Sequence, residues 1–138
     1  MPVRWQCPLA MRTRHYTSKS DVYSFGAFVY EVFSSGGTPY PELQATEVLR
    51  AVMAGHRLSS PSASTPPKVV ELMRDCTHMD VAGRPSMLMV QMWLTGLCHD
   101  MFGGGGGGGG RGEAVRLQRF KRPPASAQPL LELGLAGG

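Results

Sequence analysis

An apolar stretch at residues 22–33 limits the folds open to this chain more than any other feature. Between Asp21 and Phe33 only Ser24 and Glu31 are polar. Val, Phe and Tyr also suit a buried strand, but strands usually end within about eight residues, so the length favours a helix. A helix that is apolar on nearly every side must be buried by the rest of its domain.

The two ends of this stretch carry helix-boundary signals. Ser18 and Asp21 have the Ser-x-x-acid spacing of an N-terminal capping box, and Gly36 with Gly37 favours a stop. We therefore predict a buried central helix within residues 17–37, around which the chain is organised.

The same periodicity predicts three shorter helices downstream and an ordered loop at residues 1–11. Thr46 is the expected cap of the first of them, with Gln44 as the alternative. The predicted ranges are 46–54, 67–76 and 86–97. The last is strongly apolar and rich in methionine, which is more often core packing than a ligand site.

The composition breaks abruptly at a run of eight glycines, residues 103–110. Residues 1–102 carry a net charge of +1 and residues 103–138 a net charge of +3. We predict one modest folded domain at 1–102 and a disordered, Gly-rich basic tail at 103–138. Five basic residues with little aromatic interleaving make the tail a weak candidate for RNA, so nucleic acid is not an expected partner.

Three cysteines without paired spacing, at positions 7, 76 and 98, predict buried reduced thiols and no metal site. No apolar run reaches the roughly 20 residues of a membrane span, and the first residues lack the apolar segment of a signal peptide. We therefore expect a cytoplasmic protein without a membrane span.

Five short motifs in order resemble the carboxy-terminal half of a protein tyrosine kinase catalytic domain. They are Pro-Val-Arg-Trp at 2–5, Lys-Ser-Asp-Val-Tyr-Ser-Phe-Gly at 19–26, Pro-Tyr-Pro at 39–41, Glu-Leu-Met-Arg-Asp-Cys at 71–76 and Arg-Pro-Ser at 84–86. Each is weak alone, but the order and spacing are highly specific, and the first is typical of tyrosine rather than serine/threonine kinases. The resemblance extends from Pro2 to about Leu94.

This resemblance implies a truncated helical C-lobe of the protein-kinase-like fold. It implies that the chain begins near the end of the activation segment, which receives the protein substrate. Its substrate-binding residues would be Pro2, Val3, Arg4 and Trp5, although Arg4 and Trp5 could equally serve packing. Tyrosine-containing proteins would be the partners, and signal transduction the setting.

Two departures from the family bear on how this lobe is held together. The family's Ala-Pro-Glu reads Cys-Pro-Leu here, so Leu9 stands where a glutamate pairs with the arginine that matches Arg84. An unpaired buried arginine costs several kcal/mol, so we expect Arg84 to turn to solvent or to pair with Asp80. The family's Cys-Trp reads Cys76-Thr77, which removes a large aromatic side chain.

One family acid is retained as Asp21. In the family it accepts hydrogen bonds from the catalytic loop, but a carboxylate favoured by the helix dipole explains it equally well here. Leu9, Asp21 and Arg84 are thus expected to be structural.

The residues that carry phosphoryl transfer in the family do not occur in this sequence. It contains no Gly-rich phosphate loop, strand lysine, catalytic-loop Asp and Asn, or Asp-Phe-Gly. We therefore expect no catalytic residue, metal ligand or cofactor in this chain, whereas ATP and magnesium serve the complete family. The predicted function is that of a pseudokinase-like kinase fragment, with a non-catalytic binding or decoy module as the alternative and RNA binding through the tail as a weaker one.

Overall fold

The computed structural model describes residues 2–103, and all of the regular elements in that range are helical. In chain order they are the 3₁₀ turn η1 (Val3–Trp5), α1 (Pro8–Thr13), α2 (Ser18–Phe33), α3 (Ala45–Met53), α4 (Pro67–Cys76), the 3₁₀ turn η2 (Val81–Gly83) and α5 (Met87–Phe102). This confirms the predicted mainly helical class. The tail beyond Gly103, with its predicted disorder, lies outside the described residues.

Helix α2 begins at a capping box, but one residue earlier than the sequence indicated. The Thr17 side chain accepts from the backbone N–H of Ser20, and the Ser20 hydroxyl oxygen accepts from the backbone N–H of Thr17 at 2.7 Å. Ser18 and Asp21 therefore do not form the box. Asp21 is exposed in the first turn of the helix, where a carboxylate suits the positive end of the dipole.

The C-terminal end of α2 is closed by a left-handed turn. Its first left-handed residue is Ser35, although the sequence pointed to Gly36 and Gly37 as the stop. Ser35 has φ 57°, and the next backbone N–H, from Gly36, reaches back to the Glu31 carbonyl at 2.8 Å. Ser35 itself donates to the Val32 carbonyl. These two bonds form a Schellman motif, in which Gly36 (φ 85°) provides only the second left-handed residue.

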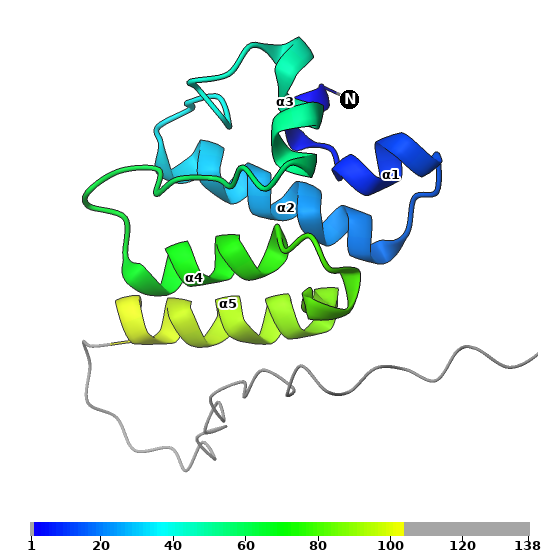
Figure 1. The fold of residues 1–138 in the computed structure, drawn as a ribbon. Coiled ribbons are helices and arrows are strands. Elements are labelled where there is room, and N and C mark those ends of the chain that lie inside the picture. Colours follow the sequence, from blue (N-terminus) through cyan, green and yellow to red (C-terminus); the bar gives the residue numbers. More distant parts are fainter. Residues whose placement is uncertain (1, 104–138) are drawn as a thin grey trace, which may run out of the picture. The chain divides into compact units, whose positions relative to one another are not determined.

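Helix α2 is the centre of the described part, and α4 is its main partner (Figure 1). The helices approach closely at Gly26, where an added Cβ would lie 2.7 Å from Thr77 Cγ2 and 2.8 Å from Cys76 Cβ. Thr77, in place of the family's tryptophan, fills this contact and donates to the Met73 carbonyl. The prediction of a buried central helix is confirmed.

Two apolar clusters cover opposite parts of α2. The larger joins the end of α2 to α3, α4 and the loops between them, and its buried members are Val29, Tyr30, Tyr40, Val48, Val52, Leu58, Val69 and Met73. The smaller joins the start of α2 to α4 and α5 through Val22, Leu72, Cys76 and Val90.

The two middle helices agree closely with the sequence prediction. Helix α4 has the predicted bounds, with Pro67 in its first turn. Helix α3 begins after Gln44, the alternative cap, rather than at Thr46. The reason is that the Glu47 carboxylate accepts the backbone N–H of Gln44 at 3.0 Å, which fixes the first turn there.

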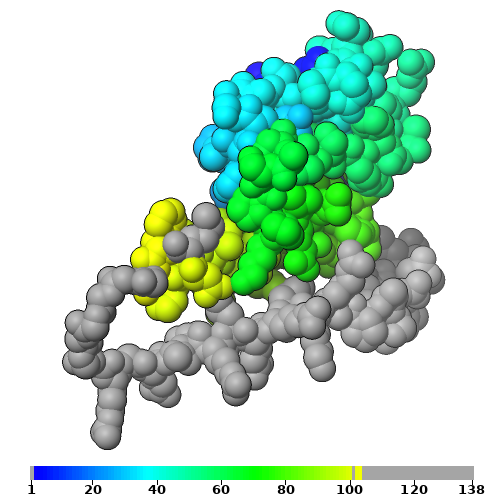
Figure 2. Space-filling view, turned by 90° about the vertical axis from the view of Figure 1, so that its left-hand side faces the viewer, coloured from blue at the N-terminus to red at the C-terminus, as the bar shows by residue number. Residues whose placement is uncertain are grey.

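Helix α5 departs most from its prediction. Ser86 caps it as expected, accepting from the Met89 N–H at 3.2 Å, but the helix continues to Phe102. Among the α5 residues whose burial the structure describes, only Val90 is buried, while Met87, Leu88 and Met92 are 42%, 65% and 48% exposed. The predicted core packing of the Met-rich stripe is therefore wrong for these residues, because α5 lies at the margin and packs along one face only. In Figure 2 its yellow C-terminal turns stand out beside the green atoms of the chain.

The start of the chain contains more helix than the predicted loop. Pro8 occupies the first turn of α1, where its missing N–H costs nothing, and Ala10 is buried. Cys7 and Cys76 are buried free thiols as predicted, but Cys98 is exposed on α5. The described residues include no helix that is long and apolar enough to cross a membrane.

Candidate functional site

The predicted substrate-side segment, Pro2 to Trp5, is fastened to the middle of the chain by two side chains. Arg4 Nη1 donates to the carbonyls of Pro39 at 3.0 Å and Tyr40 at 2.7 Å, and Nη2 donates to that of Leu43 at 2.7 Å. Trp5 Nε1 donates to Glu31 Oε2 at 2.9 Å. The segment is therefore fixed against α2 and the loop that follows it.

These bonds divide the four predicted binding residues into two kinds. Arg4 and Trp5 donate hydrogen bonds to other residues of the chain, which holds the segment in place. Pro2 is exposed and Val3 is half-buried in η1, so these two remain at the surface. Sequence reasoning gave packing and substrate contact equal weight for Arg4 and Trp5, and the contacts favour packing.

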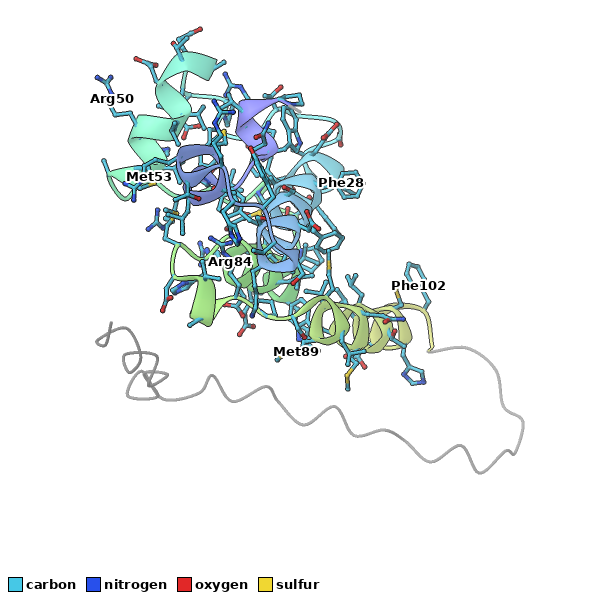
Figure 3. All side chains as sticks on the ribbon, turned by 90° about the vertical axis from the view of Figure 1, so that its right-hand side faces the viewer. Phe28, Arg50, Met53, Arg84, Met89 and Phe102 are labelled. Carbon is cyan, nitrogen blue, oxygen red and sulfur yellow. The ribbon has the colours of Figure 1, made fainter. Side chains whose placement is uncertain are left out.

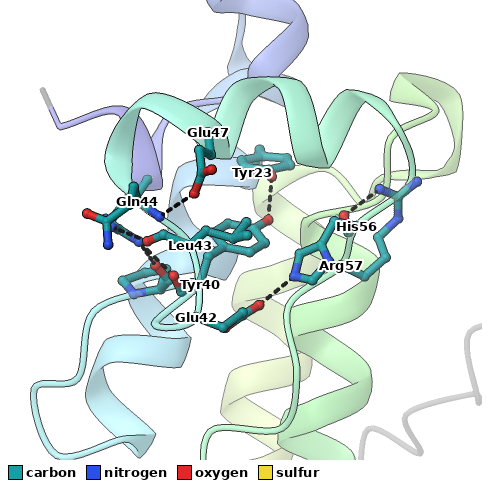
Figure 4. Close-up of polar contacts among 10 residues, drawn as sticks. Tyr23, Tyr40, Glu42, Leu43, Gln44, Glu47, His56 and Arg57 are labelled. Atoms are coloured by element: carbon teal, nitrogen blue, oxygen red, sulfur yellow. Dashed lines mark hydrogen bonds and ion pairs between the residues drawn. The ribbon is translucent and has the colours of Figure 1, made fainter.

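The loop that receives Arg4 is itself held by a buried tyrosine pair (Figure 4). The hydroxyls of Tyr40 and Tyr23 lie 2.9 Å apart, and burial raises the pKa of both phenols above their usual range. Tyr40 has φ 55°, a strained conformation for a tyrosine that this buried bond helps to hold.

The outer side of the same loop carries an exposed acid–imidazole contact. Glu42 pairs with His56, which follows α3. Burial alone would raise the pKa of Glu42, but its own backbone N–H and the His56 hydrogen bond together lower it. The contact ties the loop to the end of α3.

Arg84 is buried without a carboxylate partner among residues 2–103, contrary to both expected outcomes. It is 2% exposed, and its donors go to the carbonyls of His78 at 2.6 Å, Lys19 at 3.0 Å and Met79 at 3.5 Å. Its guanidinium also lies over the Tyr23 ring, 5.3 Å from the centroid. Carbonyl dipoles and a π face replace the missing glutamate, which makes burial of the charge tolerable.

Two residues that the sequence linked to Arg84, Leu9 at the family's glutamate position and Asp80 as the expected partner, make other contacts. Leu9 packs against the cluster of Cys7, Ala10 and Tyr23, so Leu9 and Arg84 share Tyr23 as a neighbour. Asp80 does not pair with Arg84, because its carboxylate accepts the Ala82 N–H at 3.0 Å and begins η2.

Asp21 lines a depression of about 270 Å³. The depression is lined by Gln6, Cys7, Tyr16, Ser20, Asp21 and Ser24. Its lining has one carboxylate and no basic side chain. It therefore does not fit the negatively charged phosphates of a nucleoside triphosphate. The described residues also contain no group of three His, Cys, Asp or Glu side chains that could hold a metal ion.

Sequence reasoning missed two residues that fix the site. Glu31 accepts the hydrogen bond from Trp5. The sequence did contain a signal for this residue, because Glu31 is one of only two polar residues in the apolar stretch. Tyr23 joins Tyr40 and Arg84, and nothing in the sequence set it apart from the other residues of the apolar stretch.

Comparison with known proteins decides the family. The family described as protein tyrosine and serine/threonine kinase matches residues 1–94. This chain is a member of the protein kinase family. The match includes the Pro2–Trp5 segment, α1 to α4 and the first half of α5, so the resemblance drawn from five motifs is confirmed.

A curated relative with a receptor name is similar to a large part of this chain. Fibroblast growth factor receptor 1 of Pleurodeles waltl is 40% identical to this kinase chain over 86 residues, which is 62% of the chain. The matched part is 10% of that receptor, so the chain spans about a tenth of the relative's length. This likeness supports the assignment of the chain as a fragment of a tyrosine kinase domain.

Proposed function

We propose that this chain acts as a non-catalytic binding module, the part of a tyrosine kinase lobe that meets its protein substrate. The partner would be an extended, tyrosine-containing segment of another protein. Pro2 and Val3 would contact that segment, and Arg4 and Trp5 would hold them in place. A cytoplasmic location stays a prediction that goes with this role.

The observation that carries the proposal is the set of three hydrogen bonds from Arg4 to the Pro39–Leu43 loop. Together with the Trp5–Glu31 bond, they order the segment before any partner arrives. A surface that is already ordered loses less conformational freedom on binding, which favours affinity.

The proposal excludes phosphoryl transfer by this chain alone. That reaction depends on positioning the phosphates and neutralising their charge, and the sequence contains none of the family motifs that do so. In a longer chain carrying those motifs, the same surface would serve an ATP- and magnesium-dependent tyrosine kinase. We expect calorimetry to detect no magnesium–ATP binding by the chain, and peptide phosphorylation not to exceed a no-protein control.

Binding is tested by fluorescence anisotropy with a labelled tyrosine-containing peptide. Val3→Asp places a charge on the proposed surface and should weaken binding by roughly tenfold. Ala63→Asp, which adds the same charge at an exposed turn, is the matched control and should leave binding unchanged. Equal affinities for the two variants, or no binding by the unaltered chain, would contradict the proposal.

A second candidate is a decoy that competes with a complete tyrosine kinase for its contacts. It is favoured by Phe28 and Val32, which are 52% and 54% exposed and lie one turn apart on α2. Figure 3 shows Phe28 pointing away from the helix. Exposed apolar pairs of this kind often mark protein interfaces. The double variant Phe28→Gln, Val32→Gln should then abolish inhibition of a complete kinase while leaving peptide binding intact.

A further inference from the structure

We propose that Tyr16 is a phosphorylation site of the folded chain, modified in trans by an active tyrosine kinase. The chain has four tyrosines, and Tyr16 alone is exposed, at 56%. Tyr23, Tyr30 and Tyr40 are exposed by 1%, 4% and 2%. This inference goes beyond the proposed binding function and does not depend on it.

The backbone around Tyr16 is also open to another enzyme. Residues 14–17 form no helix or turn, and every residue from 12 to 18 is exposed. A modifying enzyme must bind the backbone on both sides of the acceptor residue, which favours an exposed, irregular segment such as this one. Tyr23 and Tyr30 lie within α2, so the central helix would have to open before either could be reached.

The contacts of Tyr16 are easily released. Its hydroxyl donates to Gln6 Oε1 at 3.3 Å, a long bond at an exposed position. Tyr40, in contrast, is held by the buried hydroxyl of Tyr23 and by a strained backbone. The Tyr16 side chain can therefore leave the surface at small cost, while Tyr40 cannot.

The transfer step is that of an ordinary tyrosine kinase reaction, with ATP supplied as co-substrate. The Tyr16 oxygen forms a bond to the γ-phosphorus, the bond from that phosphorus to the bridging oxygen breaks, and ADP leaves. The phenol proton passes to the modifying kinase's base and then to water.

The charges around Tyr16 suit the product. Phosphate adds about −1.5 to −2 charges, and the sequence places Arg12, Arg14 and His15 within four residues before it. Tyr16 also directly precedes the cap of α2, where the helix dipole favours an anion. Asp21 lines the depression beside the tyrosine ring, so the phosphate would stay outside it.

The test incubates the whole chain with the catalytic domain of an active receptor tyrosine kinase and magnesium–ATP, and maps phosphate by peptide mass spectrometry. We expect phosphate at Tyr16, and roughly a hundredfold less at each of the three buried tyrosines, since each needs prior opening of the fold. Tyr16→Phe should remove the signal and, as an exposed change, should keep the circular dichroism spectrum. Synthetic peptides spanning each tyrosine provide the control for the kinase's sequence preference.

Comparable phosphate at Tyr23, Tyr30 or Tyr40 in the folded chain would overturn the inference. So would an unmodified Tyr16, whether or not the peptide spanning residues 12–20 is a substrate. Failure of peptide binding with normal labelling of Tyr16 would count against the proposed function alone, and normal peptide binding without labelling would count against Tyr16 alone.

Discussion

Helices α2 and α5 look alike as sequences, yet they differ in what they contribute to the fold. Each spans 16 residues and is rich in large apolar side chains. Helix α2 buries seven residues, among them Val22, Tyr23 and Tyr30, whereas only Val90 is buried on the described part of α5. Apolar composition therefore predicts that a helix needs partners, but the number of neighbouring elements decides how many faces are covered.

Among single substitutions, the largest expected effect comes from closing the space between α2 and α4. Gly26→Ala adds a methyl group within 3.0 Å of Thr77 and Cys76, and 3.1 Å from the Met73 carbonyl oxygen. We expect a loss of about 3 kcal/mol in the free energy of unfolding, measured by urea denaturation. Open space would instead make this change stabilising by up to about 1 kcal/mol, because alanine is the better helix former. A gain would thus contradict the close packing of α2.

A matched pair of truncations compares the two helices directly. Val22→Ala removes part of a side chain that is 0% exposed on α2 and should cost about 2 kcal/mol. Leu88→Ala removes more carbon from a side chain that is 65% exposed on α5 and should change stability by less than about 0.5 kcal/mol. Similar losses from the two variants would show that α5 is as buried as α2.

Alkaline pH should act on the buried groups of α2 and its partners. Burial raises the pKa of Tyr23 and Tyr40, and raises that of the Cys76 thiol to about 12. Above about pH 9 the unfolded chain releases these protons while the folded chain keeps them. The contribution of these groups to the free energy of unfolding is therefore fully present below that pH and is lost as the pH rises above it.

The expected slope is about 1.4 kcal/mol per pH unit for each such group. Urea denaturation between pH 8 and pH 11 measures it, and Tyr23→Phe should flatten the decline above pH 10. The hydrogen bond and charge of Lys68 on α4 lower the pKa of Asp100 on α5, so Asp100 does not contribute to this alkaline decline. A pH-independent stability up to pH 11 would refute the burial of the Tyr23–Tyr40 pair.

The smallest expected effect tests the family's arginine anchor. Leu9→Glu restores the family's carboxylate near Tyr23, but the Arg84 donors already reach three carbonyls. We therefore expect a gain of only about 0 to 1 kcal/mol, well below that of a new buried ion pair.

A double-mutant cycle of Leu9→Glu with Arg84→Met isolates the coupling in urea denaturation. If Leu9→Glu has the same effect with and without Arg84, the two positions do not couple, and the family's anchor does not carry over to this chain.

The sequence predicted the helices well and their surroundings less well. The bounds of α4 and the burial of α2 follow from local periodicity and proline placement, which a single sequence displays. The exposure of Leu88 and Met92 could not be predicted, because it depends on which elements lie beside α5.

The same distinction applies to the candidate site. The Pro2–Trp5 segment was found from its motif, but the targets of Arg4 are main-chain carbonyls, and any residue type supplies those. Arg84 was misjudged for the same reason, since only carboxylates were considered as partners and three carbonyls took their place.

Native-state hydrogen exchange tests the central claim, that α2 is the helix on which this kinase lobe is built. The backbone amides of Tyr23 to Tyr30 should exchange slowest of all the described residues, through global unfolding, and those in the second half of α5 should exchange faster through local opening. Equal protection of the two helices, or faster exchange in α2, would contradict the account.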